Sequence, residues 1–97
     1  MIVAAVQHDI CWEDRAATLA RLEPVVREAA MGSDLVVLAE MFAVGFSMNT
    51  ALLAEPVDGP TTRWLVAQAA SGSAWVGGSV PIVLDGADRP SNVFVLA

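Results

Sequence analysis

Residues 34–48 read Asp-Leu-Val-Val-Leu-Ala-Glu-Met-Phe-Ala-Val-Gly-Phe-Ser-Met. The apolar run 34–39 has the length and composition of a strand buried in a sheet, and Glu40 follows it directly. Ligands of open α/β sheets bind beyond the carboxyl ends of the strands, so Glu40 stands where chemistry is expected. A carboxylate with apolar neighbours at such a place can serve as a general base. The alternative is a structural carboxylate that caps a turn or pairs with an arginine.

The segments before and after this stretch alternate between strand and helix patterns. The short apolar run 2–7 predicts a strand covered on both faces. Apolar residues at three- and four-residue spacing predict a helix over 14–31, which bends at Pro24 and is followed by Gly32 at the C′ position, where glycine is common. Residues 40–59 are expected to be irregular, apart from a helical turn at 50–54.

The second half of the chain continues the alternation. A second long helix is expected to begin at Pro60, with Asp58 or Gly59 as its cap, and to end at Gly72. Further strands are predicted at 74–84 and 92–97, joined by a turn at 85–90. The order β-α-β-α-β-β predicts an α/β fold with helices packed on a largely parallel sheet. The last strand's apolar pattern is unfinished at Ala97, so we expect the chain to be a fragment.

Composition and charge exclude several classes of function. The chain has 97 residues, 56% of them hydrophobic, and a net charge of −6 from eleven acidic residues and five basic ones, all of which are arginine. This balance argues against binding to nucleic acid or to an anionic membrane surface. No stretch approaches the roughly 20 apolar residues of a membrane span, and no signal peptide is recognisable. With a single cysteine, Cys11, the default expectation is a reducing, cytoplasmic setting.

Other chemically interesting residues have mainly structural interpretations. His8 and Cys11 could form a thiolate pair, but a small buried cysteine is the stronger interpretation. Two such ligands fall short of a metal site, so we expect no metal and no cofactor. The sequence Gly77-Gly78-Ser79 lies within a strand and lacks the context of a phosphate loop or a nucleophilic serine. Trp64 and Trp75 are interpreted as core residues.

Three motifs together resemble a known family. The stretch 34–48 resembles the first catalytic motif of the nitrilase superfamily, the carbon–nitrogen hydrolases, and most closely the omega-amidase-like branch. Residues 3–7, Val-Ala-Ala-Val-Gln, resemble that family's opening strand. Residues 76–81 and 91–95 resemble its third strand and its Asn-containing fourth strand. The resemblance implies that residues 1–97 are the N-terminal, incomplete part of a carbon–nitrogen hydrolase domain with an α-β-β-α sandwich fold.

The resemblance also implies a mechanism in which a Glu-Lys-Cys triad hydrolyses a carboxamide. Glu40 would be the general base that deprotonates the cysteine, and Phe42 would wall the substrate pocket. The lysine would stabilise the oxyanion of a reaction that passes through a thioester. The chain contains no lysine, Cys11 precedes Glu40 instead of following it, and Ala39 replaces the usual proline. We therefore expect the 97 residues alone to be inactive.

Two functions remain open from the sequence. The first is part of a cytoplasmic amidase that acts on a small-molecule amide, the ω-amide of a dicarboxylic acid, without a cofactor and as a homodimer. The second is a non-catalytic remnant that serves as a protein-interaction module through an open sheet edge. A small nucleotide-binding domain ranks last, because no phosphate loop is present.

Overall fold

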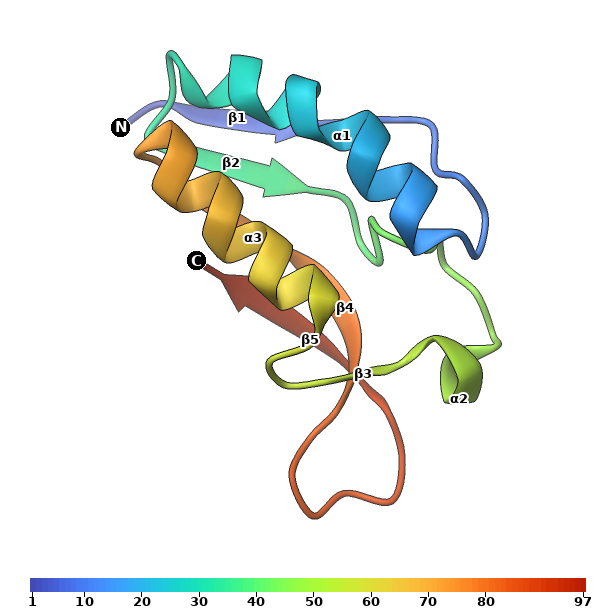
Figure 1. Cartoon of the computed structure of the whole chain (residues 1–97). Helices are drawn as coiled ribbons and strands as arrows, with labels where there is room; N and C mark the ends of the chain where they lie inside the picture. Colours follow the sequence, from blue (N-terminus) through green and yellow to red (C-terminus); the bar gives the residue numbers. More distant parts are fainter.

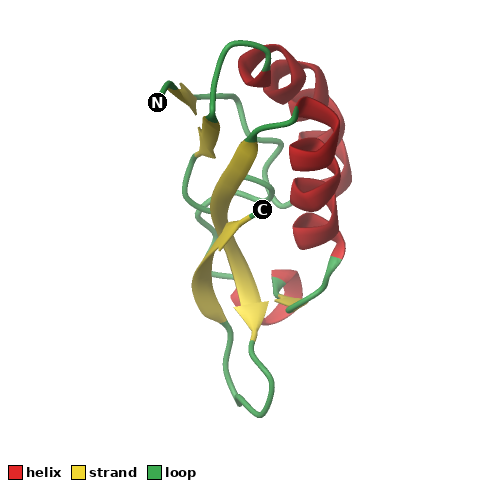
Figure 2. Cartoon of the chain, turned by 90° about the vertical axis from the view of Figure 1, so that its left-hand side faces the viewer, coloured by secondary structure: helices red, strands yellow, loops and turns green.

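A mixed sheet carries both long helices on one face, and its other face is bare (Figures 1 and 2). The computed structural model describes all 97 residues. The elements in chain order are β1 (Val3–Val6), α1 (Arg15–Ala30), β2 (Leu35–Leu38), α2 (Thr50–Leu53), β3 (Glu55–Pro56), α3 (Pro60–Gly72), β4 (Trp75–Val83) and β5 (Ser91–Leu96). The α/β class expected from the sequence is confirmed.

Strand β4 is the centre of the sheet. It pairs in parallel with β2 near its start and with β3 near its end, while β5 pairs with it antiparallel from Gly77 to Ile82. Since β5 occupies one edge of β4 over this whole length, β2 and β3 must follow one another along the opposite edge. After β2 the chain turns away from the edge of β4, and it rejoins that edge at β3. The sheet therefore has a gap between β2 and β3.

The ends of the helices follow from local chemistry. The side chain of Asp14 accepts a hydrogen bond from the backbone N–H of Ala17, which caps α1. Pro24 lies inside α1 without ending it, as predicted. Gly32 directly follows the C-cap residue Met31 and so occupies the expected C′ position, although its φ is not positive. At the end of α3 it is Ser73, with φ of 51°, that is left-handed.

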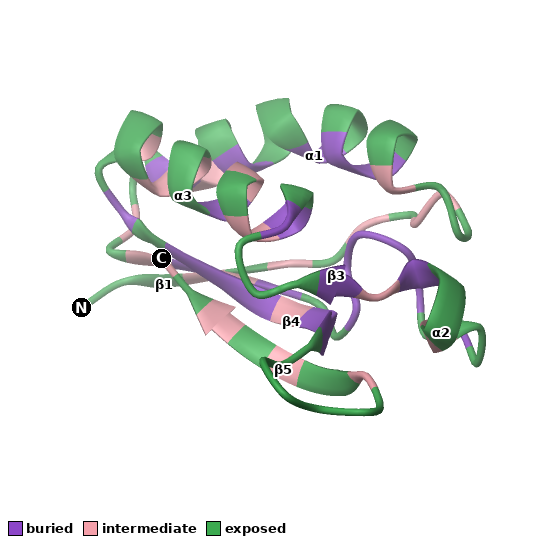
Figure 3. Cartoon of the chain, turned by 60° about the horizontal axis from the view of Figure 1, so that its bottom comes forward, coloured by how far each residue is buried: buried purple, intermediate pink, exposed green.

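The core lies between the two long helices and the sheet (Figure 3). Alternate residues of the strands point into it, since successive strand side chains face opposite sides of a sheet. Trp64 packs against this core, as the sequence predicts. Its most completely buried members come from α1, β2, α3, β4 and the segment after β2, namely Leu22, Val26, Val36, Phe42, Val44, Leu65, Val76, Val80 and Ile82.

The opposite face of the sheet is uncovered, which corrects two expectations. Strand β1 was expected to be covered on both faces, yet Val3 is 51% exposed and alternate residues of β1 face solvent. Trp75 was interpreted as core and is 57% exposed. The two wrong predictions, for β1 and for Trp75, have one cause. Helices pack on only one face of this sheet, so the strand side chains that point to the other face are exposed to water (Figure 2). Phe94 and Leu96 of β5 are exposed on the same side.

None of the three helices has the length and hydropathy that a membrane span requires.

Candidate active site

Glu40 lies at the gap that opens where β2 leaves β4. Its backbone neighbour Met41 adopts a left-handed conformation, with φ of 49°, and buries its side chain in the core. The backbone N–H of Met41 donates a hydrogen bond of 2.8 Å to Oγ of Ser79 on β4. This turn sends the Met41 and Phe42 side chains into the core. It leaves Glu40 exposed, so the apolar wall expected around the carboxylate is only partly present.

The Glu40 carboxylate has one partner in the chain. Nδ2 of Asn92, on β5, donates a hydrogen bond of 2.6 Å to its Oε1. Because Ser79 pairs directly with Phe94 across the antiparallel strands, Asn92 and Ser79 are diagonal neighbours on one face of the sheet. The two residues that hold the Glu40 segment therefore come from one pair of strands.

An open cavity of about 330 Å³ lies beside Glu40, and Leu38, Glu40, Ser79, Asn92 and Phe94 line it. The carboxylate thus faces a hollow beyond the carboxyl end of β2, the place where the sequence predicts a ligand. Another hollow of about 350 Å³ adjoins Asp34, Ser73 and Trp75 at the start of β2 and β4. It contains none of the predicted site residues.

Phe42 occupies the core in this chain. Its ring is fully buried, and the centroids of Phe42 and Trp64 are 6.0 Å apart. The ring lies directly over Gly78, where an added Cβ would come within 2.6 Å of it. The aromatic ring that lines the cavity is that of Phe94, and the role of Phe42 at a substrate remains a prediction.

His8 and Cys11 do not form a catalytic pair in this structure. Nε2 of His8 is 3.0 Å from the carbonyl oxygen of Phe42, and since a carbonyl only accepts, Nε2 must carry the proton. Cys11 is bound through its backbone, whose N–H donates to Oγ1 of Thr18 and whose carbonyl accepts from the same hydroxyl. His8 thus supports the segment that follows Glu40 and has no bond to the thiol.

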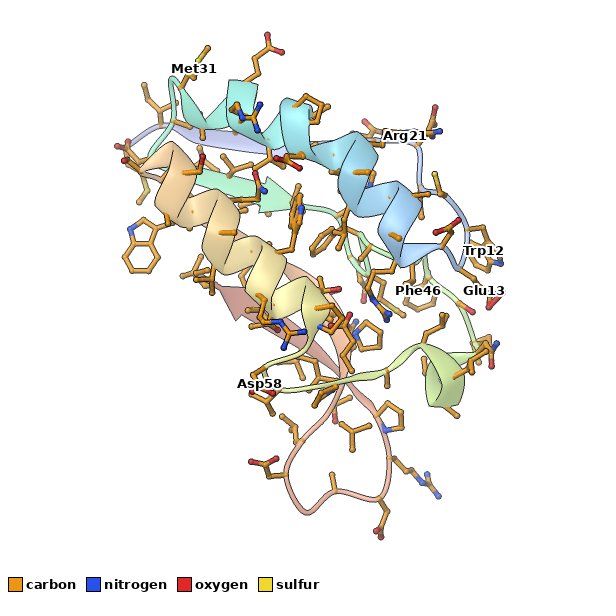
Figure 4. All side chains as sticks on the ribbon, in the orientation of Figure 1. Trp12, Glu13, Arg21, Met31, Phe46 and Asp58 are labelled. Atoms are coloured by element: carbon orange, nitrogen blue, oxygen red, sulfur yellow. The ribbon has the colours of Figure 1, made fainter.

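The loop after Glu40 returns to the start of α1. Gly45, with φ of 90°, lies beneath the ring of Trp12, and an added Cβ would come within 2.6 Å of that ring. Ser47 Oγ donates to a carboxylate oxygen of Glu13 at 3.0 Å. Figure 4 shows Trp12, Glu13 and Phe46 together at this end of the molecule, where Trp12 and Phe46 are exposed.

A second carboxylate, Glu55 in β3, was not predicted from the sequence. It is 3% exposed, and its Oε1 accepts from the backbone N–H of Thr61 at 2.7 Å, in the first turn of α3. Its Oε2 accepts from the Thr61 hydroxyl and is 2.7 Å from Nε of Arg15. The Nε–H bond is not aligned with that oxygen, so this contact is an ion pair rather than a good hydrogen bond. The N-cap residue is Gly59, one of the two candidates from the sequence, and Glu55 accepts the side-chain hydrogen bond from the first turn.

No group of three or more His, Cys, Asp or Glu side chains is arranged to hold a metal ion.

The family model described as carbon-nitrogen hydrolase matches residues 2–87. The chain belongs to the carbon–nitrogen hydrolase family. Comparison with curated proteins finds no match.

Solved structures give the same fold. A CN-hydrolase superfamily protein from Xanthomonas campestris, with an arsenic adduct in its active site, is 34% identical with a TM-score of 0.89, over 98% of this chain and 35% of its own. An amidase of the nitrilase superfamily from Nesterenkonia AN1 is 23% identical with a TM-score of 0.79, over 100% of this chain and 38% of its own. An N-terminal amidase is 15% identical with a TM-score of 0.81, over 98% of this chain and 24% of its own. The chain therefore spans between 24% and 38% of the length of these proteins.

Proposed function

We propose that this chain contributes the general base, Glu40, to an amidase that converts a small carboxamide to an acid and ammonia. The observation that carries the proposal is the Glu40 carboxylate in its cavity. One oxygen is held by Asn92, and the other, Oε2, has no hydrogen-bond partner in the chain. A carboxylate held in this way can accept a proton without first breaking an ion pair.

In the proposed reaction, Glu40 takes the proton of a cysteine thiol, and the thiolate attacks the amide carbon. The C–N bond breaks, ammonia leaves with a proton from the glutamic acid, and a thioester remains. Glu40 then takes a proton from water, which attacks the thioester and releases the carboxylic acid and the thiol. A lysine ammonium would stabilise the oxyanion in both halves. In a mutant of the amidase from Nesterenkonia sp. AN1, acrylamide has added to the active-site cysteine, in keeping with a sulfur nucleophile.

Neither the lysine nor this cysteine can come from the 97 residues. The chain has no lysine, and its single cysteine, Cys11, is bound through its backbone to Thr18 instead of lying at the Glu40 cavity. We therefore expect the isolated chain to hydrolyse no amide. The omega-amidase branch, ω-amides of dicarboxylic acids as substrates, a homodimer and a cytoplasmic location are parts of this proposal and rest on the resemblance alone.

The second candidate function, a non-catalytic interaction module, has one observation in its favour. The bare face of the sheet exposes Val3, Trp75, Phe94 and Leu96, and apolar surface of this kind is typical of a binding face.

The test is ammonia release from small ω-amides. It compares the protein expressed from its natural gene, its Glu40→Gln variant and the 97-residue chain. We expect activity in the first, a loss of roughly 10²–10⁴-fold in the second because the base is removed, and none in the third. Turnover by the 97-residue chain, or full activity of Glu40→Gln, would refute the proposal. A gene that stops at codon 97 would favour the interaction module, and one that continues to a lysine and a cysteine would favour the enzyme.

A further inference from the structure

We infer that Asn92 and Ser79 are positioning residues for Glu40, which together fix the direction of its free carboxylate oxygen. The inference rests on the proposed function, because it names the groups that prepare the proposed base. Neither residue is assigned a step in the reaction. Asn92 acts on the side chain of Glu40, and Ser79 acts on the backbone that follows it.

The contact with Asn92 restricts an otherwise mobile side chain. An exposed glutamate has several rotatable bonds, and ordering it costs conformational entropy. A hydrogen bond from an amide to a carboxylate is stronger than one between two neutral groups, and it opposes that cost. With Oε1 bound to Asn92, the unpartnered oxygen is Oε2. The bond therefore selects which oxygen is available to accept a proton.

The contact with Ser79 fixes where the Glu40 side chain starts. A left-handed conformation is unfavourable at a residue other than glycine, so Met41 must be held in it. The hydrogen bond from Met41 N–H to Ser79 Oγ and the burial of the Met41 side chain both do so. Without them the turn can relax, and the Cα–Cβ bond of Glu40 would change direction.

The two anchors are linked by the sheet itself. Ser79 lies on β4 and Asn92 on β5, in a continuous antiparallel register that runs from Gly77 to Ile82. Their separation is therefore set by backbone hydrogen bonds and does not depend on the loop 84–90 that joins the strands. A rigid pair of strands holds both the base and the turn that carries it, an arrangement that favours precise placement.

The experiment uses NMR on the labelled 97-residue chain, and it needs no enzyme activity. In the wild type we expect one Glu40 rotamer, with contacts between the Asn92 side-chain amide protons and the Glu40 γ protons. Asn92→Ala should average the rotamers and abolish those contacts. Ser79→Ala should speed exchange of the Met41 amide proton roughly tenfold, and Ser79→Thr, which keeps the hydroxyl, should restore it. The matched control is Asn49→Ala, which removes an amide that contacts a different carboxylate, Glu13.

The catalytic part is measured on the protein expressed from its natural gene. Asn92→Ala should lower kcat roughly 10- to 100-fold with little change in KM, because a misdirected base affects the chemical step. Asn49→Ala should change neither. The inference would be overturned if the Glu40 rotamers were unaltered in Asn92→Ala. It would also be overturned if Asn92→Ala left kcat unaltered in an enzyme that Glu40→Gln inactivates. Either result would leave the proposed function standing. Absence of any amidase activity would defeat the proposed function, while the NMR result would still report on the positioning itself.

Discussion

Two carboxylates lie on the same edge of β4, and their surroundings differ. Glu55, in β3, is buried and faces both a cation, Arg15, and the start of α3 at Thr61. Glu40, after β2, is exposed and has one neutral partner, Asn92. A buried charge requires compensation, and once Glu55 is fully bonded it has no oxygen left for chemistry. We expect the partners of the two carboxylates, more than their places on the sheet, to separate the structural role of Glu55 from the proposed role of Glu40.

Removing the buried contacts of Glu55 with Arg15 and Thr61 should have the largest effect on stability. Glu55→Ala leaves Arg15 without its counter-ion and two donors of Thr61 unsatisfied, so we expect a loss of about 3 kcal/mol in the free energy of unfolding. Glu55→Gln keeps the shape and should cost less. Urea denaturation followed by circular dichroism measures both. The control is Glu23→Ala, which removes the exposed pair with Arg27 and should cost less than about 0.5 kcal/mol. Equal losses in Glu55→Ala and Glu23→Ala would contradict the structural role.

The support behind the Glu40 turn should be the next most sensitive feature. In Gly78→Ala the new Cβ would lie 2.6 Å from the Phe42 ring and 3.1 Å from Cβ of Leu38, and the buried ring has little room to move. We expect a loss of about 1–3 kcal/mol from overpacking. Gly32→Ala is the matched control. No atom lies within 4 Å of the added Cβ and the backbone φ is not positive, so its stability should be unchanged or slightly raised. If Gly78→Ala left the free energy of unfolding unchanged, Phe42 would have to pack loosely enough to move away from the new Cβ.

The smallest effect is expected at the proposed base itself. Glu40→Gln keeps an oxygen that can accept from Asn92, and the side chain is exposed, so stability should change by less than about 0.5 kcal/mol. The same urea experiment measures it. If Glu40→Gln were as destabilising as Glu55→Ala, the two carboxylates would be alike, and Glu40 would be a structural residue.

Local patterns were sufficient to predict much of the fold. Apolar spacing and terminal signals located both long helices, and the helical turn at 50–54 was confirmed as α2. Strand β3 was missed, because its two residues, one of them a proline, carry no strand pattern. Trp75 was misassigned to the core because its strand has apolar side chains on both faces. Such a pattern predicts a strand covered on both faces, whether or not a second layer is present.

The site could be predicted only at its centre. Glu40 was singled out because it follows a buried strand, a feature of the local sequence. Its link to Asn92 spans 52 residues, and Ser79 is 38 residues from Met41, so neither partner could be derived from spacing. The Asn-containing fourth strand and the Gly-Gly-Ser strand were recognised by resemblance, without a role. Partners of this kind depend on strand register, which only the folded sheet defines.

The bare sheet face makes the behaviour of the chain depend on ionic strength. Val3, Trp75, Phe94 and Leu96 lie on strand faces that hold no helix, while the molecule as a whole carries a charge of −6. Mutual repulsion keeps such molecules apart in dilute buffer, and at about 1 M salt the Debye length falls to roughly 3 Å. Light scattering should therefore rise when sodium chloride is added, because contacts between hydrophobic faces are then no longer opposed by long-range charge.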